Sequence, residues 1–547
     1  MVNIKNILFL NPPDPSLLEN HTSAGYAYFE PPLGLLYVYS FIKSRNDFDV
    51  KFVDLNIEMK FISKTNIVDT LKTHINDFRP DLIAISTLYY SSIPVFHLLA
   101  EHIKNINSNI LVVFGGHYPT HLTDQCLSDS NIDYAILSEG ELGFSDLIDA
   151  LNGKRTLKDV DGVAFKNGED IIKNPRRTFW EGFADVKRLP WEDTHFHYYF
   201  REGRNVLYRI KKKEEIKLAT LTATRGCPNA CTFCSSSSFW KRRWRKRNIS
   251  NVIDEIRYLK ETYNVNTVVF NDENISIDKS WLIEFLKELA KLNITWISGG
   301  GLSIRTINDD NVIQMMYESG IGLFNLAIES GSNDTLKRVK KPLTTEETDN
   351  TVKLIRKYGD AVAIGFFIVG FPFEDLAGVK QTINYADSLD LDWKCFYCFQ
   401  PFPGSDLYTY SKERRLIEDF DIHYGENYFS PDMKHIDYTS EELNKLNYMA
   451  NLKSNFVNNR NLKIGTNHSL LQAERDFNYV LGMVPNHVFA LLGLSEVMRL
   501  RKIKSKRIEY LTLAKEAATG DKGLDWQYYL KQFQCNIDLM LKETYDN

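Results

Sequence analysis

The stretch "TRGCPNACTFCSS" at residues 224–236 brings together Cys227, Cys231 and Cys234 in the spacing C-x3-C-x2-C. No fourth cysteine completes the group nearby. A structural zinc site takes four protein ligands, usually as two CxxC pairs, and a redox pair takes a single CxxC. Three thiolates fit a [4Fe–4S] cluster that is one protein ligand short. The pattern therefore predicts a cluster whose fourth iron is open to a small molecule.

S-adenosylmethionine (SAM) can bind such an iron through its amino and carboxylate groups. Electron transfer from the cluster then breaks the sulfonium bond and gives a 5′-deoxyadenosyl radical, which is chemistry of the cofactor that the protein holds and orients. The alternative is a loop in which the cysteines are incidental. Their tight spacing disfavours that interpretation.

Length and composition describe an ordinary globular chain. Its 547 residues exceed one core and suggest three or four units. With 43% hydrophobic and 25% charged residues, net charge −5 and a pI near 6.2, the chain is not predicted to be drawn to nucleic acid or to an anionic membrane. No apolar run is long enough for a membrane span, and the N-terminus lacks the features of a signal peptide. The seven cysteines are odd in number and clustered, so we expect reduced thiols and a cytoplasmic location.

The first part of the chain, residues 1–154, alternates short apolar runs with helical patterns. The runs are "ILFL" (7–10), "VKFV" (50–53), "LIAIS" (82–86), "ILVVF" (110–114) and "YAIL" (134–137). Each run is apolar throughout, as a strand buried on both faces should be. Five β/α units of this kind predict a doubly wound parallel sheet of the α/β class, with ligands beyond the carboxyl ends of its strands.

The remaining chain divides into three further segments. Residues 155–215 are interpreted as a linker with some short strand pairing. Residues 216–405 contain six strand candidates, 218–224, 267–272, 294–300, 321–330, 362–370 and 393–402, which suit a (β/α)6 partial barrel with its active site at the carboxyl ends of the strands. The three cysteines follow the first of these strands. Residues 406–547 are expected to be helical, and residues 473–500 have the pattern of a tetratricopeptide-type helix–turn–helix that packs on the barrel.

The cysteine motif in this setting resembles the radical SAM superfamily. Phe233, just before the third cysteine, matches the aromatic residue that packs near adenine in that family. "VVFNDEN" (268–274) resembles the second-strand segment at the methionine end of SAM, which implicates Asn271 and Asp272. "LAIESGS" (326–332) points to Glu329, and "FIVGFP" (367–372), with Gly370, and "PFPGS" (401–405) resemble later-strand elements of the family.

The N-terminal part resembles the cobalamin-binding domain that precedes many radical SAM barrels. It has no GxGxxG fingerprint for a dinucleotide. The resemblance rests on "EPPLGLLYVYSFIK" (30–43), "GGHYPT" (115–120) and "SEGE" (138–141) and covers about residues 1–405. It implies cobalamin contacts from the loops after the strands: Ser86, Thr87, Gly115, Gly116, His117, Glu139 and Gly140. The Asp-x-His-x-x-Gly motif of many cobalamin domains is broken in "ENHTSAG" (19–25), so His21 is not expected to bind cobalt.

Two smaller features have both a functional and a simple structural interpretation. "KRRWRKR" (241–247) has the composition of a nucleic-acid patch, but the acidic total favours a solvated loop that leads into a helix at 250–259. "CFYC" (395–398) would point Cys395 and Cys398 to opposite faces of a strand, so they are not expected to share a metal. They are expected to pack, although one of them could face the barrel lumen and handle a hydrogen atom.

The resemblance implies a cobalamin-dependent radical SAM enzyme that functionalises an unactivated carbon, most often by methyl transfer. The first alternative keeps the same cofactors but performs a cyclisation or an oxidative rearrangement. A methylthiotransferase acting on RNA is disfavoured because such relatives carry three more N-terminal cysteines, whereas this part of the chain has only Cys126. A non-catalytic corrinoid scaffold is the remaining hypothesis. The expected partners are a small-molecule or peptide substrate and an electron donor of the flavodoxin or ferredoxin type, under anaerobic conditions.

Overall fold

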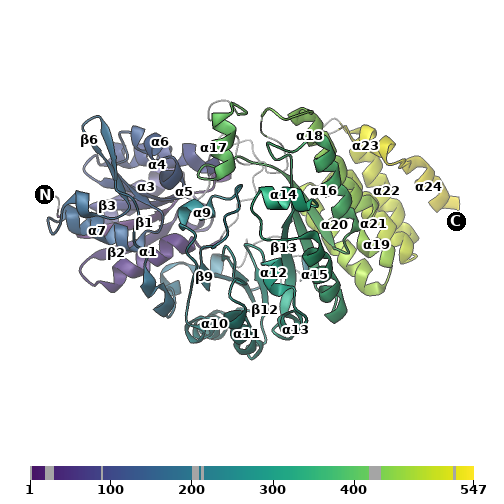
Figure 1. The fold of residues 1–547 in the computed structure, drawn as a ribbon, viewed down its shortest axis with the longest axis horizontal. Coiled ribbons are helices and arrows are strands. Elements are labelled where there is room, and N and C mark those ends of the chain that lie inside the picture. The colour runs from purple at the N-terminus through teal and green to yellow at the C-terminus, as the bar shows by residue number, and fades with distance from the viewer. Residues whose placement is uncertain are drawn as a thin grey trace.

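The computed structural model describes residues 3–18, 30–87, 90–199, 209–210, 215–417, 431, 433–520 and 525–546. The stretch "ENHTSAG" (19–25) with His21 lies outside these ranges, and the segment 155–215 is described only in part. In the ranges that are described, every helix is too short or too polar to cross a membrane. Figure 1 shows the N-terminal elements at one end of the molecule, the second sheet in the middle and the C-terminal helices at the other end.

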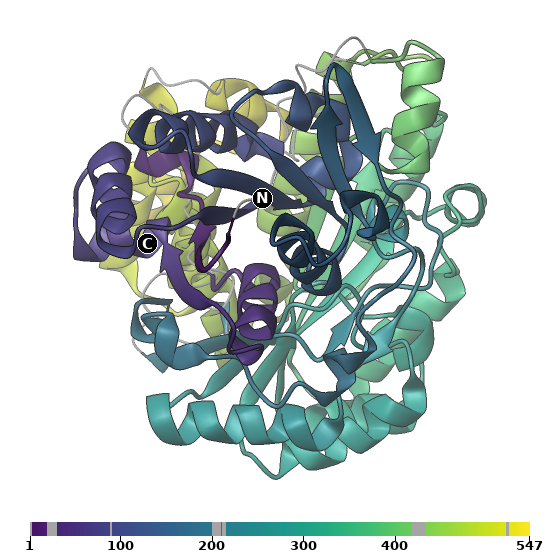
Figure 2. The ribbon, with the colours of Figure 1, turned by 90° about the vertical axis from the view of Figure 1, so that its left-hand side faces the viewer.

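The N-terminal sheet has the predicted doubly wound arrangement. Its parallel strands are β1 (Asn6–Asn11), β2 (Asp49–Asp54), β3 (Leu82–Thr87), β4 (Leu111–Gly116) and β5 (Tyr134–Leu137), in the order β2-β1-β3-β4-β5. Helices α1 (Leu33–Ser44) and α7 (Glu141–Leu151) cover one face, and α3 (Ile67–Phe78) and α4 (Ile93–Ile106) cover the other. The order of the strands reverses between β1 and β3, so a ligand is expected at the carboxyl ends of these two strands. This edge faces the rest of the molecule in Figure 1, and Figure 2 looks onto the N-terminal end.

The strands are apolar throughout because both faces of the sheet are covered. In β1, Leu8 packs into the buried cluster on the α3 and α4 side, whereas the next residue, Phe9, packs into the cluster on the α1 and α7 side. Both side chains are fully buried. Successive strand residues point to opposite faces, so neither position tolerates a polar side chain without a partner.

The short strand pairing expected within residues 155–215 forms at residues 163–173, where the strands join the N-terminal sheet. Strands β6 (Val163–Asn167) and β7 (Asp170–Lys173) pair antiparallel and extend the N-terminal sheet to seven strands, with β6 beside β5. Gly168, at φ +67°, lies in the turn between them, where a left-handed conformation suits glycine. The hairpin satisfies the backbone groups at the edge of β5, which a linker would have left open.

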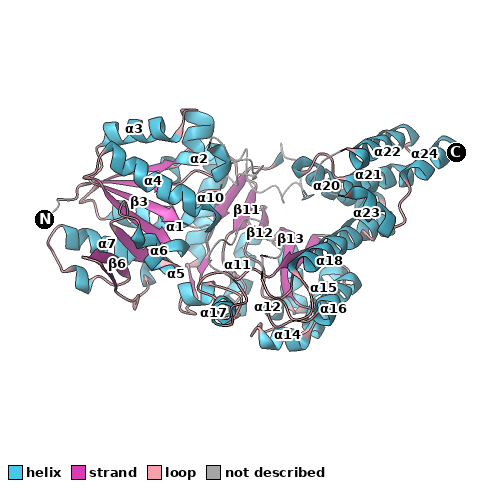
Figure 3. Ribbon diagram, turned by 90° about the horizontal axis from the view of Figure 1, so that it is seen from above, coloured by secondary structure: helices cyan, strands magenta, loops and turns pink. Residues whose placement is uncertain are grey.

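The second sheet is the predicted six-stranded parallel sheet. Its strands are β8 (Leu218–Leu221), β11 (Thr267–Phe270), β12 (Thr295–Ser298), β13 (Ile321–Glu329), β14 (Val362–Val369) and β15 (Trp393–Cys398), in sequential order across the sheet. One face is covered by α10 (Ile249–Tyr263), α11 (Lys279–Ala290), α13 (Asp310–Glu318), α15 (Thr345–Tyr358) and α16 (Leu376–Ser388). The strands lie between the N-terminal sheet and the C-terminal helices in Figure 3.

The C-terminal helices pack on the other face of this sheet. They include α18 (Ser440–Leu452), α20 (Asn467–Met483), α21 (Val488–Leu500), α22 (Lys504–Thr519), α23 (Trp526–Gln532) and α24 (Ile537–Asp546). One buried cluster contains Val269 and Leu323 of the sheet together with Phe477 of α20. Gly493 lets α21 approach α20, because a Cβ at this position would lie 2.6 Å from the Phe477 ring. The helix–turn–helix predicted at 473–500 therefore forms and packs on the barrel.

Candidate active site between the two sheets

The three cysteines lie on a loop closed by a short pair of strands. The expected strand at 218–224 ends at Leu221, and the chain continues as β9 (Thr224–Arg225), which pairs antiparallel with β10 (Arg245–Lys246). We call the intervening residues 226–244 the cluster loop. Gly226, at φ +82°, begins it, and a Cβ there would lie 2.1 Å from the Arg243 carbonyl oxygen. The loop can therefore close only with glycine at this position.

The cysteine thiols are neighbours in a largely buried environment. Burial raises the pKa of Cys231 to about 12 and that of Cys234 to about 11, and the charge of Cys227 adds to both effects. Across the described ranges, no three His, Cys, Asp or Glu side chains converge on one point where they could bind a single metal ion. A [4Fe–4S] cluster does not require such a group, because each thiolate binds a different iron. The donor set fits this cluster, with iron binding displacing the thiol protons.

A largely buried lysine beside the cysteines was not predicted from the sequence. The Lys341 Nζ donates to Glu329 Oε1 at 2.9 Å, and the Cys231 Sγ lies 3.8 Å from the Lys340 carbonyl oxygen. Burial opposes the charge of Lys341, but Glu329 and Cys231 outweigh it and raise its pKa. Lys341 thus supplies positive charge where thiolates are needed. The two adjacent lysines at 340–341 are the only signal in the sequence, and they match no motif.

A cavity of about 200 Å³ brings together two of the residues predicted to contact SAM. Phe233 and Glu329 line it, together with Ile368, Tyr397, Cys398, Phe399, Gln400 and Phe402. Glu329 adopts φ +69°, which is uncommon for a residue other than glycine. Such a conformation, at the end of β13, is held by its surroundings and is typical of functional sites.

The other three residues predicted to contact SAM lie elsewhere. Asn271 lines a larger cavity on the N-terminal side of the cluster loop. Asp272 is buried and accepts hydrogen bonds from the backbone N–H groups of Ala223 and Thr224, and burial raises its pKa to about 7. A Cβ at Gly370 would lie 2.4 Å from Leu443 of α18. In this structure Asp272 shapes the chain leading to the cluster loop, and Gly370 allows close packing of α18.

Cys395 and Cys398 point in different directions, as expected for positions i and i+3 of a strand. Cys395 lies in the cluster buried under the C-terminal helices. Cys398 lines the smaller cavity with Phe233 and Glu329. Burial raises the pKa of Cys398 to about 12, so it remains a thiol at neutral pH.

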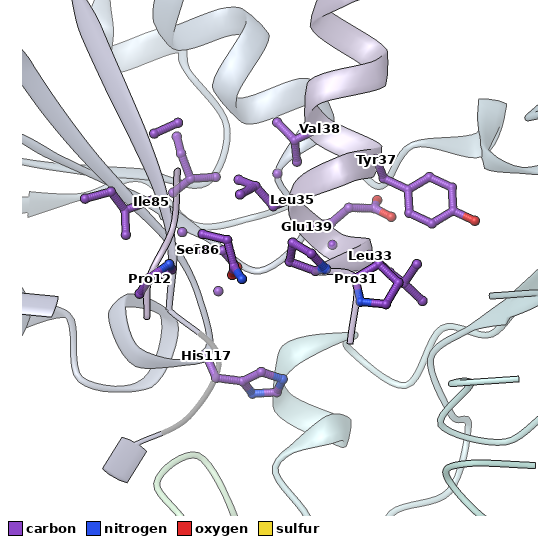
Figure 4. A pocket seen from close by; sticks show the side chains of 18 of the residues that line it. Pro12, Pro31, Leu33, Leu35, Tyr37, Val38, Ile85, Ser86, His117 and Glu139 are labelled. Carbon is purple, nitrogen blue, oxygen red and sulfur yellow. The ribbon is translucent and has the colours of Figure 1, made fainter. Parts of the chain in front are cut away.

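A cavity of about 390 Å³ lies between the carboxyl edge of the N-terminal sheet and the cluster loop (Figure 4). Six of the seven residues predicted to contact cobalamin line it: Ser86, Gly115, Gly116, His117, Glu139 and Gly140. Thr87 does not, because its Oγ1 donates to the Gly115 carbonyl oxygen at 2.8 Å. The opposite wall comes from the barrel and the cluster loop, with Thr222, Arg225, Phe239, Trp240, Asn271 and Glu273.

The walls of this larger cavity suit a large ligand that approaches the backbone. Gly34 of α1 and Gly115 of β4 both line it. A Cβ at Gly34 would meet no atom within 4 Å, and one at Gly115 would meet only the Ile136 Cβ, at 3.9 Å. Apolar side chains such as Leu35 and Ile85 alternate with polar groups such as Ser86 around the cavity (Figure 4). The cavity therefore fits a corrin with its amide-bearing edge, and glycine leaves the space open.

Glu273 is a second residue that sequence reasoning missed. It follows Asp272, yet it reaches the cluster loop, where its Oε2 accepts from the Gly226 N–H at 2.8 Å. Its Oε1 accepts from the Trp240 Nε1–H at 2.6 Å. Glu273 thus ties the first residue of the cluster loop to Trp240, near the other end of the loop. Three consecutive polar residues at 271–273 gave no basis for choosing which one would do so.

Comparison with known families agrees with this arrangement. Residues 221–386 match the Radical SAM superfamily, and residues 23–148 match the B12 binding domain. The chain thus contains both domains of a cobalamin-dependent radical SAM enzyme. The matched ranges coincide with the two parts that face each other across the larger cavity.

Relatives of this radical SAM enzyme include methyltransferases and cyclases. An uncharacterized methyltransferase of Pyrococcus horikoshii is 29% identical over 81% of this chain and 91% of its own length. Cytidylyl-2-hydroxyethylphosphonate methyltransferase of Streptomyces wedmorensis is 26% identical over 74% and 81% of the two chains. The anaerobic magnesium-protoporphyrin IX monomethyl ester cyclase of Synechocystis sp. is 26% identical over 75% and 78%.

Solved structures share the fold of this radical SAM enzyme. OxsB, a cobalamin-dependent SAM radical enzyme solved with aqua-cobalamin and SAM, superposes with a TM-score of 0.63 over 99% of this chain and 81% of its own, at 14% identity. TsrM from Kitasatospora setae, a radical SAM methyltransferase solved with cobalamin and a [4Fe–4S] cluster, gives 0.59 over 75% and 78%, at 16% identity. The first alignment extends over the C-terminal helices as well.

The basic run at 241–247 is solvated only in part. Lys241, Arg242 and Arg243 are exposed, whereas Arg247 is fully buried and pairs with Glu255 at 2.7 Å. Arg245 is also largely shielded and pairs with Glu139. The interpretation of the whole run as a solvated loop is therefore wrong for these two arginines, because they neutralise buried carboxylates.

A half-buried histidine at the junction of the two sheets is expected to make the protein acid-sensitive. The His121 Nδ1 lies 2.7 Å from the Tyr90 hydroxyl, and its Nε2 lies 3.0 Å from the Ser238 hydroxyl of the cluster loop. Burial lowers the pKa of His121 from 6.5 to about 3. The unfolded chain therefore takes up a proton as pH falls below about 6.5 while the folded chain does not, and stability falls by up to about 1.4 kcal/mol per pH unit.

Denaturant unfolding of the cluster-free protein over the range from pH 7 to about pH 4 tests this expectation. In His121→Gln, the loss of stability on acidification should be smaller than in the parent. His468→Gln, which changes an exposed histidine of α20, serves as the control and should keep the parental pH dependence. The same pH dependence in all three proteins would contradict the assignment.

Proposed function

We propose that this enzyme uses a radical derived from SAM, together with cobalamin, to methylate an unactivated carbon of a small-molecule or peptide substrate. One observation carries the proposal: the cluster loop forms a wall of both cavities. Phe233 faces the smaller cavity, and Phe239 and Trp240 face the larger one. A radical source on one side of the loop and a methyl carrier on the other would thus be held in adjacent sites.

The residues of this chain bind and orient the two cofactors. Cys227, Cys231 and Cys234 hold the cluster, and Glu329 with Lys341 supplies a paired carboxylate and ammonium beside the space for SAM. The loops after β3, β4 and β5 hold the corrin against the barrel. When bound, these groups supply reductive cleavage of SAM and a transferable methyl group. The aromatic lining of both cavities keeps water from the radical.

Exposed positive charges beside the cysteines support an acidic electron donor of the flavodoxin or ferredoxin type, and we propose that the pair works in the cytoplasm. Arg242 Nε donates to the Pro228 carbonyl oxygen, one residue after Cys227, at 3.1 Å. Lys241, Arg242 and Arg243 expose three consecutive positive charges at this point. Charge complementarity of this kind guides association with an acidic partner.

The product distinguishes methyl transfer from the main alternative. Anaerobically purified protein, reconstituted with cobalamin, is incubated with SAM carrying a labelled methyl group, a low-potential reductant and an extract of the producing cell. Methyl transfer gives a product that gains one CH₂ unit and the label. A cyclisation or oxidative rearrangement, as in the cyclase relatives, gives a product with neither. A corrinoid scaffold would not cleave SAM at all.

Glu329→Gln is expected to weaken SAM binding while sparing the cluster. The substitution removes the carboxylate charge of Glu329, which pairs with Lys341 at the edge of the smaller cavity. The loss of a charged hydrogen bond from Glu329 to SAM would cost about 1.5–3 kcal/mol of binding free energy. The dissociation constant for SAM should therefore rise roughly tenfold or more. Phe233→Ala should also weaken SAM binding.

Calorimetry on the protein with its cluster measures this change, together with the iron content. Glu347→Gln is the matched control, because Glu347 caps α15 and lines neither cavity. Unchanged SAM affinity in both Glu329→Gln and Phe233→Ala would show that these residues do not contact SAM.

A further inference from the structure

One buried carboxylate of the N-terminal domain holds both ends of the cluster loop. Glu139 lies between β5 and α7, and its Oε1 is 2.7 Å from Arg225 Nη1 and 2.9 Å from Arg245 Nη2. Arg225 immediately precedes the cluster loop and Arg245 immediately follows it. The three side chains are 3%, 7% and 9% exposed. We call Glu139, Arg225 and Arg245 the clasp.

The surroundings fix the geometry of the clasp. The Arg225 guanidinium lies 4.2 Å from the centre of the Tyr37 ring and 4.4 Å from that of Phe183. It also reaches Glu141 Oε1 at 2.7 Å. Burial alone would raise the pKa of Glu139, but Arg225 and Arg245 outweigh it and hold the pKa below its usual value. The carboxylate is therefore charged and shared between two arginines.

Further contacts dock the cluster loop on the same loops of the N-terminal sheet. The Ser138 hydroxyl, next to Glu139, donates to the Phe239 carbonyl oxygen. The His117 ring stacks on Phe239 with centroids 4.4 Å apart. Ser138, His117 and Phe239 all line the larger cavity. The loop that carries the cysteines and the loops that line the expected corrin site therefore form one contiguous contact.

We propose that the clasp sets the separation and orientation between the cluster and the cobalamin, and so couples the two halves of the reaction. This inference rests on the proposed function, since it needs both cofactors. The clasp residues act as positioning residues. The Glu139 carboxylate already accepts hydrogen bonds from two arginines and from the Trp180 N–H. Its value to the reaction is geometric, because a misplacement of about 1 Å can cost about 100-fold in rate.

The chain contains a second buried ion pair, whose carboxylate contacts neither Arg225 nor Arg245. Arg247 and Glu255 are completely buried and 2.7 Å apart. Glu255 also accepts from the Leu189 N–H and the Trp191 indole N–H, and it ties residues 189–191 to α10. It lines neither cavity. If the clasp merely stabilised the fold, Glu139→Gln and Glu255→Gln would behave alike.

The experiment measures the dipolar interaction between Co(II) cobalamin and the reduced cluster by electron paramagnetic resonance of the holoenzyme. The parent should show one narrow distribution of the interaction. Glu139→Gln should broaden or shift it, and Glu255→Gln should leave it as in the parent even if the unfolding temperature falls by the same amount. Arg245→Gln, at the rim of the clasp, provides a second test if Glu139→Gln does not fold, and it should also broaden the distribution.

Each outcome decides between the hypotheses. A parental distribution in both clasp variants would overturn the clasp, as would equal broadening in Glu255→Gln. If the parent does not hold both the cluster and cobalamin, the proposed function fails, and the clasp fails with it. If the parent holds both and shows the narrow distribution, only the comparison of variants decides the role of Glu139.

Discussion

Replacing Cys227, Cys231 and Cys234 together by alanine is expected to abolish the iron–sulfur cluster. Anaerobically purified parent should hold about four irons and four sulfides per chain, and the triple variant should hold none. All three thiols lie on the cluster loop, so the triple variant removes every thiolate of the C-x3-C-x2-C motif. Iron and sulfide analysis, with the visible absorption of the cluster, measures the loss.

The remaining cysteines provide the matched control. Cys395→Ala and Cys398→Ala in one chain should leave the iron content unchanged, because these thiols point to opposite faces of β15. A triple variant that retains a full cluster would refute the ligand assignment. Loss of iron in the control variant would show that Cys398, at the smaller cavity, is a ligand.

Gly34→Leu is expected to have the second largest effect, a loss of cobalamin binding with the fold intact. Gly34 lines the larger cavity, and a Cβ there would meet no atom of the protein within 4 Å. Leucine also favours a helix by almost 1 kcal/mol over glycine, so α1 should not suffer. Overfilling a well-packed site costs about 1–3 kcal/mol, which corresponds to roughly tenfold weaker binding or more.

Retention of cobalamin after reconstitution and gel filtration measures this effect by absorbance. Gly482→Leu is the matched control, because Gly482 is also helical, exposed and free of atoms within 4 Å, but it lies in α20 among the C-terminal helices. Gly34→Leu should lose cobalamin while keeping its iron, and Gly482→Leu should keep both. Equal retention of cobalamin by the two variants would place the corrin outside this cavity.

Much of the fold could be predicted from short-range patterns. The runs at 7–10 and 110–114 became β1 and β4 because an apolar run of this length is buried on both faces of a parallel sheet. The sequence did not show that the hairpin β6–β7 belongs to the N-terminal sheet. That assignment depends on the pairing of β6 with β5, which is a tertiary contact. Strand β8 ends early because the Asp272 carboxylate, 49 and 48 residues further along the chain, accepts hydrogen bonds from the backbone N–H groups of Ala223 and Thr224.

Residues of a motif with fixed spacing could be predicted, and residues that meet only through tertiary contacts could not. Glu329 and Lys341 meet at 2.9 Å across 12 residues of chain. Glu139 meets Arg225 across 86 residues, and each looks alone like an ordinary surface charge in the sequence. Conversely, Asn271 and Asp272 stand in the expected segment, but Glu273 is the side chain that reaches the cluster loop.

The sequence by itself determined the chemistry of the ligands and the order of the units. Three thiolates in a C-x3-C-x2-C spacing after a strand, with a doubly wound pattern in front, require no tertiary information, because ligand type and strand burial are local properties. Only the tertiary structure decided which charges meet between the two sheets. A buried ion pair depends on desolvation and on distances of a few ångströms between segments far apart in the chain. Local sequence determines neither quantity.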